Sequence, residues 1–300
     1  MPERPAGSQR VREVLVAVAH GSADPRAAAT VADLMAVVEE RAASRGPWLP
    51  EVRTAYLGHA APSLPQVMGA IGCGQVTVLP LLLTAAYHSK TDIPRVLDRV
   101  RGEFPRLRTG YGTPLGPHPL LLRALERRLA EADPLGPAWH ADPAARGRTG
   151  VVLAAAGSTD PEANATVARL AARWQARAGW FAVRPAVPSP SPPGALDAPP
   201  SLVAPAELLG PGGAAPFGSG GRPGAPTPAE AVAALLRAGA WRVLVATYLL
   251  APGFFADRIR ESALAAGAAA VGSPLGASPE VAEVLLDRYE EAGSRGRTAA

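Results

Sequence analysis

Short, continuously apolar runs alternate along this chain with longer segments in which apolar residues recur at helical spacing. The first run, at 15–19, is apolar throughout, which is typical of a strand covered on both faces. Asp24 and Pro25 then supply the cap and the first position of a helix that we expect to extend to about residue 43. The same patterns predict further strands at 52–57, 76–83 and 109–112, and helices at 64–71, 92–101 and 119–131. This alternation indicates a parallel sheet with helices on both faces and right-handed crossovers.

The chain then repeats this plan. Residues 15–34 align without gaps on residues 151–170, and the aligned positions share a Gly-Ser pair and an Asp-Pro pair. Two further matches follow in the same order, pairing 76–88 with 243–255 and 112–116 with 272–276. Three matches in one order indicate a duplicated domain.

The second copy is interrupted by a long insertion. Its patterns predict strands at 151–155, 181–185 and 243–250, and helices at 161–178, 229–238 and 279–292. Pro, Gly, Ala and Ser dominate 188–226, where almost no periodicity remains, so we expect a long loop without packed structure. The predicted organisation is an N-terminal domain at 11–132, a linker at 133–148 and a C-terminal domain at 149–293.

Composition excludes several classes of protein. The net charge of +4 is modest and the basic residues are scattered, which is unlike a nucleic-acid binder. Cys73 is the only cysteine, so a disulfide or a zinc site of several cysteines cannot form within the chain. The first apolar run is too short for a signal peptide, and no apolar run reaches the ~20 residues of a membrane helix. We therefore expect a cytoplasmic protein without membrane or nucleic-acid partners.

Two histidines follow predicted strands of the first copy. His20 comes directly after the first strand, and His88 follows the third after a short turn. Ligands of open α/β sheets bind at the carboxyl edge, where both imidazoles should project. Gly21 has no side chain and Ser22 has a small one, so a flat ligand can approach the backbone at this edge. A single histidine in such a place is more often a hydrogen-bonded loop residue than a ligand, but two at one edge favour a shared site.

The second copy lacks both imidazoles. Ala156 takes the place of His20 and Phe255 the place of His88, while the surrounding Gly-Ser and Asp-Pro pairs are kept. A structural role would be expected in both copies, so the asymmetry favours one active site per chain, although drift at two positions would give the same pattern.

Three segments resemble the signature segments of the class II chelatases, the sirohydrochlorin cobaltochelatases and ferrochelatases. They are AHGSADP at 19–25, LPLLLTAAYHSKTDIP at 79–94 and YGTPLGPHP at 111–119. The resemblance implies an α/β fold of two similar chelatase-like halves, each a parallel sheet flanked by helices, that face each other across a cleft. It also implies that His20 and His88 are the catalytic and metal-binding residues. The inserted ion would be Co²⁺ or Fe²⁺, with Ni²⁺ a further candidate, for cobalamin or sirohaem biosynthesis.

One position departs from the pattern of that family. Its members often carry an acidic residue in the segment matched here by 56–63, where this chain has Gly58 with His59 beside it. His59 is therefore either a substitute metal ligand or a solvated loop residue.

The implied chemistry suits imidazole. Neutral imidazoles hold a borderline divalent ion less permanently than thiolates do, and a histidine with a pKa near 6.5 accepts pyrrole protons at neutral pH. The substrate of the resembling family is a polycarboxylate, so Lys90 and Arg95 are candidate binding residues, whereas Arg26 is more readily a solvated helix charge. His118 could contact substrate, but its counterpart Ser278 looks like a helix cap, so capping is the alternative. His140, in the linker, has no assigned role.

The metal is thus a substrate, no organic cofactor is expected, and internal duplication favours a monomer. Two other functions stay open. A non-catalytic metal or tetrapyrrole carrier would use the same histidines, and a phosphate- or nucleotide-binding protein would use Gly-Ser at a helix N-terminus. The second is disfavoured because the chain contains neither a P-loop nor a GxGxxG motif.

Overall fold

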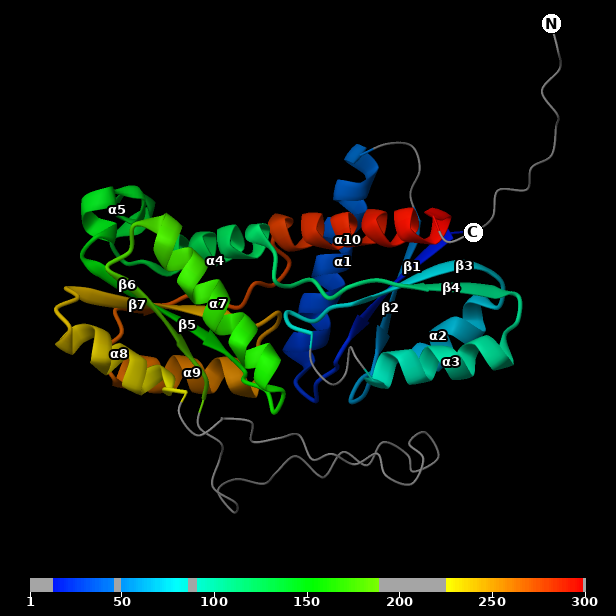
Figure 1. Cartoon of the computed structure of the whole chain (residues 1–300), viewed down its shortest axis with the longest axis horizontal. Helices are drawn as coiled ribbons and strands as arrows, with labels where there is room; N and C mark the ends of the chain where they lie inside the picture. The colour runs from blue at the N-terminus through cyan, green and yellow to red at the C-terminus, as the bar shows by residue number, and fades with distance from the viewer. Residues whose placement is uncertain (1–12, 46–49, 86–90, 189–224, 299–300) are drawn as a thin grey trace, which may run out of the picture.

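The computed structural model describes residues 13–45, 50–85, 91–188 and 225–298. They form two sheets, each of four parallel strands, in the orders β2-β1-β3-β4 and β6-β5-β7-β8 (Figure 1). The first sheet comprises β1 (Glu13–Ala19), β2 (Glu51–Tyr56), β3 (Gly74–Pro80) and β4 (Leu107–Tyr111). The second comprises β5 (Thr149–Ala155), β6 (Ala182–Ala186), β7 (Arg242–Tyr248) and β8 (Ala270–Val271). The predicted pair of similar parallel α/β halves is confirmed.

Helices flank both sheets. Those of the first copy are α1 (Pro25–Arg45), α2 (Leu64–Ile71), α3 (Ile93–Glu103) and α4 (Pro119–Ala132). Those that follow are α5 (Gly136–Ala141), α6 (Pro143–Arg146), α7 (Pro161–Ala178), α8 (Pro228–Arg237), α9 (Phe254–Ala265) and α10 (Pro279–Thr298). The sequence patterns missed α5, α6, α9 and β8. The first two and β8 are very short, and α9 begins after Gly253, which has no side chain to mark a cap.

The two sheets share one core. Helices α2 and α3 cover the outer face of the first sheet, and α8 and α9 cover the outer face of the second, each over a separate apolar cluster. The inner faces contribute to a single cluster that runs through both halves, from Leu15 and Leu79 to Leu153 and Leu244. Because each inner face is completed by the other half, the two copies form one folding unit.

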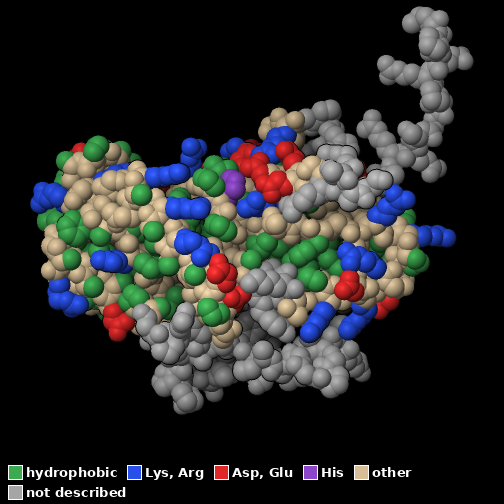
Figure 2. All heavy atoms as spheres, viewed as in Figure 1, with side chains coloured by type: hydrophobic (Ala, Val, Ile, Leu, Met, Phe, Trp, Pro, Cys, Tyr) green, Lys and Arg blue, Asp and Glu red, His purple; other side chains and the backbone are tan. Residues whose placement is uncertain are grey.

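The copies exchange their last helices. Helix α4, from the first copy, packs against β7 and β8, whereas α10, from the second copy, packs against α1, β3 and β4 (Figure 1). A buried ion pair fixes the end of α4 on the second sheet, because the two terminal guanidinium nitrogens of Arg242 donate to Asp133, at 2.6 and 2.7 Å. On the outer side of α10, Figure 2 shows a gathering of acidic side chains, where Arg45 of α1 pairs with Glu283 and Asp287.

Equivalent arginines secure both exchanged helices. Arg128 of α4 donates to the carbonyl oxygen of Leu275, at 3.0 and 3.3 Å. Arg288, at the matching position of α10, donates to the carbonyls of Pro114 and Leu115, at 3.0 and 3.3 Å. Each arginine thus binds the Pro-Leu-Gly turn after the last strand of the opposite half, and the contact recurs in both copies.

No helix in the described ranges is both long enough and apolar enough to span a bilayer. Most of the insertion predicted at 188–226 lies outside the described residues, but both of its ends lie within them. The backbone N–H of Val187 donates to the carbonyl of Pro226 at 3.0 Å, so the chain leaves and rejoins the fold at one point.

Replacing residues 189–224 with a short Gly-Ser turn should therefore leave the melting temperature nearly unchanged, because closing a shorter loop between adjacent ends carries little entropic cost. Thermal denaturation followed by circular dichroism tests this expectation. A large drop in melting temperature would show that the insertion packs against the fold.

Arg288→Met should lower the free energy of unfolding by roughly 1.5–3 kcal/mol, because it removes charged hydrogen bonds to backbone carbonyls. Arg127→Met is the matched control. Arg127 also crosses from α4 to α10 but forms a partly exposed ion pair with Glu280, which should contribute no more than about 1 kcal/mol. Urea denaturation measures both, and equal effects would contradict a special role for Arg288.

Candidate functional site

The carboxyl edge of the first sheet brings two histidines together. His20 directly follows β1, and His59 lies in the loop after the neighbouring parallel strand β2. Their rings are stacked, with centroids 6.5 Å apart and an interplanar angle of 26°. With metal–nitrogen bonds of ~2 Å, an ion lies ~3 Å from a ring centre, so two rings that share one ion span at most ~6 Å, and these two would have to move slightly closer to do so.

Backbone hydrogen bonds set this spacing. The ladder between the two strands continues beyond their ends, with Leu57 N–H donating to Ala19 O and Gly58 N–H to His20 O, both at 3.1 Å. His59 then adopts a left-handed conformation with φ of 59°, which is uncommon for a residue with a side chain. The turn reverses the chain toward Ala60, and it leaves the His59 ring beside His20.

Gly21 makes the approach of the two loops possible. Its φ is 89°, and a Cβ atom at this position would lie 1.7 Å from the carbonyl oxygen of Gly58. No side chain fits there, so the packing of the two loops accounts for this glycine independently of any ligand.

The hydrogen bonding of His20 selects a tautomer. Its Nδ1 lies 3.0 Å from the carbonyl oxygen of Gly21, and a carbonyl can only accept, so Nδ1 carries the proton of this hydrogen bond. When the ring is neutral, Nε2 then has the lone pair that a metal ion or a proton needs. Burial lowers the pKa of His59, which favours the neutral form of this ring at neutral pH.

The second half reaches the loop that follows His20. Arg26 pairs with Asp24 and with Asp257 at the start of α9, each at 2.6 Å. Ser22 accepts the N–H of Asp24 through its hydroxyl, at 3.1 Å, and therefore also shapes this loop. Sequence reasoning did not identify Asp257, because its partner lies in the other copy and no local motif marks it.

Other candidate residues lie elsewhere. His118 caps α4 by accepting the Leu120 N–H at its Nδ1, at 3.3 Å, and burial, followed by the nearby Arg288, lowers its pKa. Its counterpart Ser278 was expected to cap α10, but its buried hydroxyl has no hydrogen-bond partner in the described part of the chain. Arg95 is exposed on α3.

His88 and Lys90 lie outside the described residues, so the expected approach of His88 to His20 stays a prediction.

His140 is buried against Trp180, with ring centroids 5.0 Å apart, in the short helix α5. Within the described ranges, no three His, Cys, Asp or Glu residues are grouped to hold a metal ion, and the pair His20 and His59 is the described part of the candidate site.

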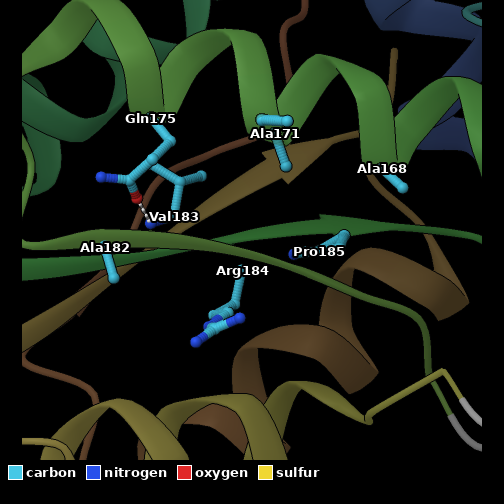
Figure 3. A pocket seen from close by; sticks show the side chains of 8 residues that line it. Ala168, Ala171, Gln175, Ala182, Val183, Arg184 and Pro185 are labelled. Atoms are coloured by element: carbon cyan, nitrogen blue, oxygen red, sulfur yellow. Dashed lines mark hydrogen bonds between the residues drawn. The ribbon is translucent and has the colours of Figure 1, made fainter.

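A hollow of about 460 Å³ lies between α7 and the edge strand β6 (Figure 3). Alanines supply half of its lining residues, and its polar side chains are Arg184 and Gln175, which accepts the N–H of Val183. It contains no metal ligand. Ala171 lines it where the first copy has the larger, buried Met35, so the hollow reflects a smaller side chain in the second copy.

Comparison with known proteins gives consistent matches. The sequence profile of the CbiX family matches residues 14–132 and 224–292. The sirohydrochlorin cobaltochelatase of Priestia megaterium is 30% identical over 122 residues, which are 40% of this chain and 38% of that protein. The sirohydrochlorin ferrochelatase of Bacillus subtilis is 32% identical over 100 residues, which are 33% of this chain and 34% of that protein. The matched segments thus span little more than a third of the length of either relative.

Solved structures are similar in fold over nearly the whole chain. SirB from Bacillus subtilis with Fe³⁺ superposes with a TM-score of 0.65 at 23% identity, covering 95% of this chain and 98% of that one. SirB from Bacillus subtilis subspecies spizizenii in complex with cobalt also gives 0.65, at 19% identity, with coverage of 96% and 97%. These structures share the two-sheet architecture described above.

Gly21→Ala should disrupt the edge of the sheet, because the added methyl group cannot fit against the Gly58 carbonyl. We expect a loss of roughly 2 kcal/mol or more in the free energy of unfolding, from the unfavourable φ and the clash. Gly239→Ala is the matched control, since its φ is 99° but nothing lies within 4 Å of the place that its methyl group would take. Urea denaturation of both variants separates the clash from the backbone strain, and equal losses would rule out the clash.

Proposed function

The chain belongs to the CbiX family, and from that premise we propose that it is a sirohydrochlorin-type chelatase, a lyase that inserts Co²⁺ or Fe²⁺ into a tetrapyrrole for cobalamin or sirohaem biosynthesis. The observation that carries this proposal is the pairing of His20 with His59 at the carboxyl edge of the first sheet. Internal duplication supplies both halves of the fold in one chain, which supports a monomer.

In this proposal the imidazoles hold the incoming ion. The Nδ1 of His20 is engaged by the Gly21 carbonyl, so Nε2 is the atom that faces the ion. His59 binds as a neutral ring, and His88 completes the set. Two or three neutral nitrogens hold a divalent ion of this class and still release it to a macrocycle that offers four nitrogens.

The same rings also serve proton transfer. Insertion of a divalent ion displaces two N–H protons from the pyrroles, and an imidazole that has given up its metal can accept one at neutral pH. His20 and His88 are the proposed acceptors. Lys90 and Arg95 are the proposed contacts for substrate carboxylates, with Gly21, Ser22 and His118 as further proposed contacts.

A carrier that binds metal or tetrapyrrole without turnover is the alternative, since it would use the same histidines. Binding of a phosphate at the N-terminus of α1 is disfavoured because the Asp24 side chain already lies there. Asp24 accepts the N–H of Arg26 there at 2.9 Å, so a carboxylate already fills the position that an anion would take. Anaerobic assays of metal insertion into sirohydrochlorin with Co²⁺, Fe²⁺ and Ni²⁺, followed by absorbance, distinguish enzyme from carrier and identify the metal.

His20→Ala and His88→Ala should each slow metal insertion by a factor of roughly 10² or more, the range for loss of a general base, with the melting temperature nearly unchanged. Ala156→His and Phe255→Ala change the corresponding positions of the second copy and should stay within a few-fold of wild type. Full activity in the His20/His88 double alanine variant would refute this mechanism.

A further inference from the structure

One histidine outside the candidate site is buried where the chain passes from the first half to the second. His140 lies in α5, directly after α4, and is only 5% exposed. Its ring meets that of Trp180 edge to face, with centroids 5.0 Å apart and an interplanar angle of 61°. Neither ring nitrogen has a hydrogen-bond partner among the described residues. A side chain with two polar atoms is thus held in this place by packing.

A histidine in such surroundings lowers stability where an apolar side chain of similar shape would not. A buried polar atom without a partner loses its hydrogen bonds to water and gains none in return. Its presence in a folded core therefore asks for an explanation. Histidine differs from the apolar residues that would fit here in that its charge changes near neutral pH. The structure therefore directs attention to the protonation of His140.

Charged groups from three elements act on the imidazole of His140. The cations are Arg146 of α6 and Arg242 of β7, and the anions are Glu126 and Asp133 of α4. Both anions already have a cation beside them. Asp133 accepts from Arg242 at 2.6 and 2.7 Å, and Glu126 lies 3.5 Å from Arg146. A protonated His140 would therefore meet two cations and two carboxylates that are already paired.

The backbone of α5 is tied to the same cluster. The carbonyl oxygen of His140 accepts from the Nε of Arg146 at 2.8 Å. The guanidinium of Arg146 lies over the Trp180 ring, 4.6 Å from its centroid, and donates to the carbonyl of Ala178 at 3.1 Å. The imidazole and this arginine thus hold α5 on the second half together, and a positive charge on the imidazole would repel the arginine.

We propose that His140 is an acid-sensitive switch that releases the linker helix α5 from the second half. The neutral ring stays packed against Trp180. The protonated ring needs water around its charge, and it reaches water only when α5 opens. This inference goes beyond the function proposed above and does not depend on the chemistry of His20 and His59.

The direction of the pH effect follows from the surroundings of the ring. Burial lowers the pKa of His140, and the charge of Arg146 lowers it further. In the open state the imidazole has its ordinary pKa of about 6.5. The open state therefore binds the proton more tightly than the closed state. The closed linker is favoured above about pH 6.5 and loses stability as the pH falls below that value toward the lowered pKa of the buried ring.

Hydrogen–deuterium exchange of residues 136–146, corrected for the intrinsic effect of pH on exchange, measures the opening of this helix. Between pH 7.5 and pH 5.5 we expect the opening constant of the wild-type chain to rise roughly three- to tenfold, because an imidazole of ordinary pKa gains up to that factor from protonation. His140→Phe keeps a ring but cannot take up a proton, so its opening constant should change less than about twofold. His140→Leu is a second apolar variant for the same comparison.

His118→Asn is the matched control. Burial also lowers the pKa of His118, but this residue caps the other end of α4, and asparagine keeps an oxygen that can cap a helix. Exchange of residues 136–146 in this variant should respond to pH as it does in the wild-type chain. A wild-type response that is absent, or one that persists in His140→Phe or His140→Leu, would overturn the proposal. Unfolding of both apolar variants at pH 7.5 would also overturn it, because His140 would then be needed for packing.

Discussion

The exchange of α4 and α10 is the constraint on which the rest of this structure depends. The inner apolar face of each sheet is covered by a helix of its own copy, α1 or α7, and by the last helix of the other copy, so neither copy completes its core alone. Arg128 and Arg288 add charged hydrogen bonds that tie each exchanged helix to the opposite turn. These bonds have a direction and the apolar contacts do not, so the arginines fix the position of helices that burial alone would hold loosely.

A short series of contacts connects the exchanged helix α10 with the segment after β3. Arg288 binds the carbonyls of the turn that ends in Gly116, and Gly116 lies against the segment of Leu82 and Leu83. Tyr248 approaches the same segment from the second sheet. The loop between β3 and α3 therefore begins at a point that residues of both copies define. The second copy, which has neither His20 nor His88 at the matching positions, thus contributes a contact to this segment of the first copy.

Much of the fold followed from local signals, whereas the site needed contacts that only the folded chain has. The continuous apolar runs and the Asp-Pro pair placed β1, α1, β5 and α7 well, because caps and periodicity are encoded locally. The exchange of α4 and α10 could not be predicted, since an apolar helix face fits either inner sheet face. The nearness of His59 to His20 depends on the Gly58 N–H bond and on a left-handed backbone, and neither has a signature in the sequence. An imidazole next to the expected acidic position was the only hint.

The choice of imidazole over carboxylate at this edge affects which ions can bind. Carboxylate oxygens favour hard ions such as Mg²⁺ and Ca²⁺, which are abundant, whereas imidazole nitrogens favour Co²⁺, Ni²⁺ and Fe²⁺. Burial favours the neutral form of His59, and the Gly21 carbonyl directs the lone pair of His20 toward its Nε2. Neutral ligands also leave the full charge on a bound divalent ion. If the chain is the chelatase proposed above, the negative charges of a polycarboxylate macrocycle would be drawn to the ion itself, so the bound metal would help to recruit its own acceptor.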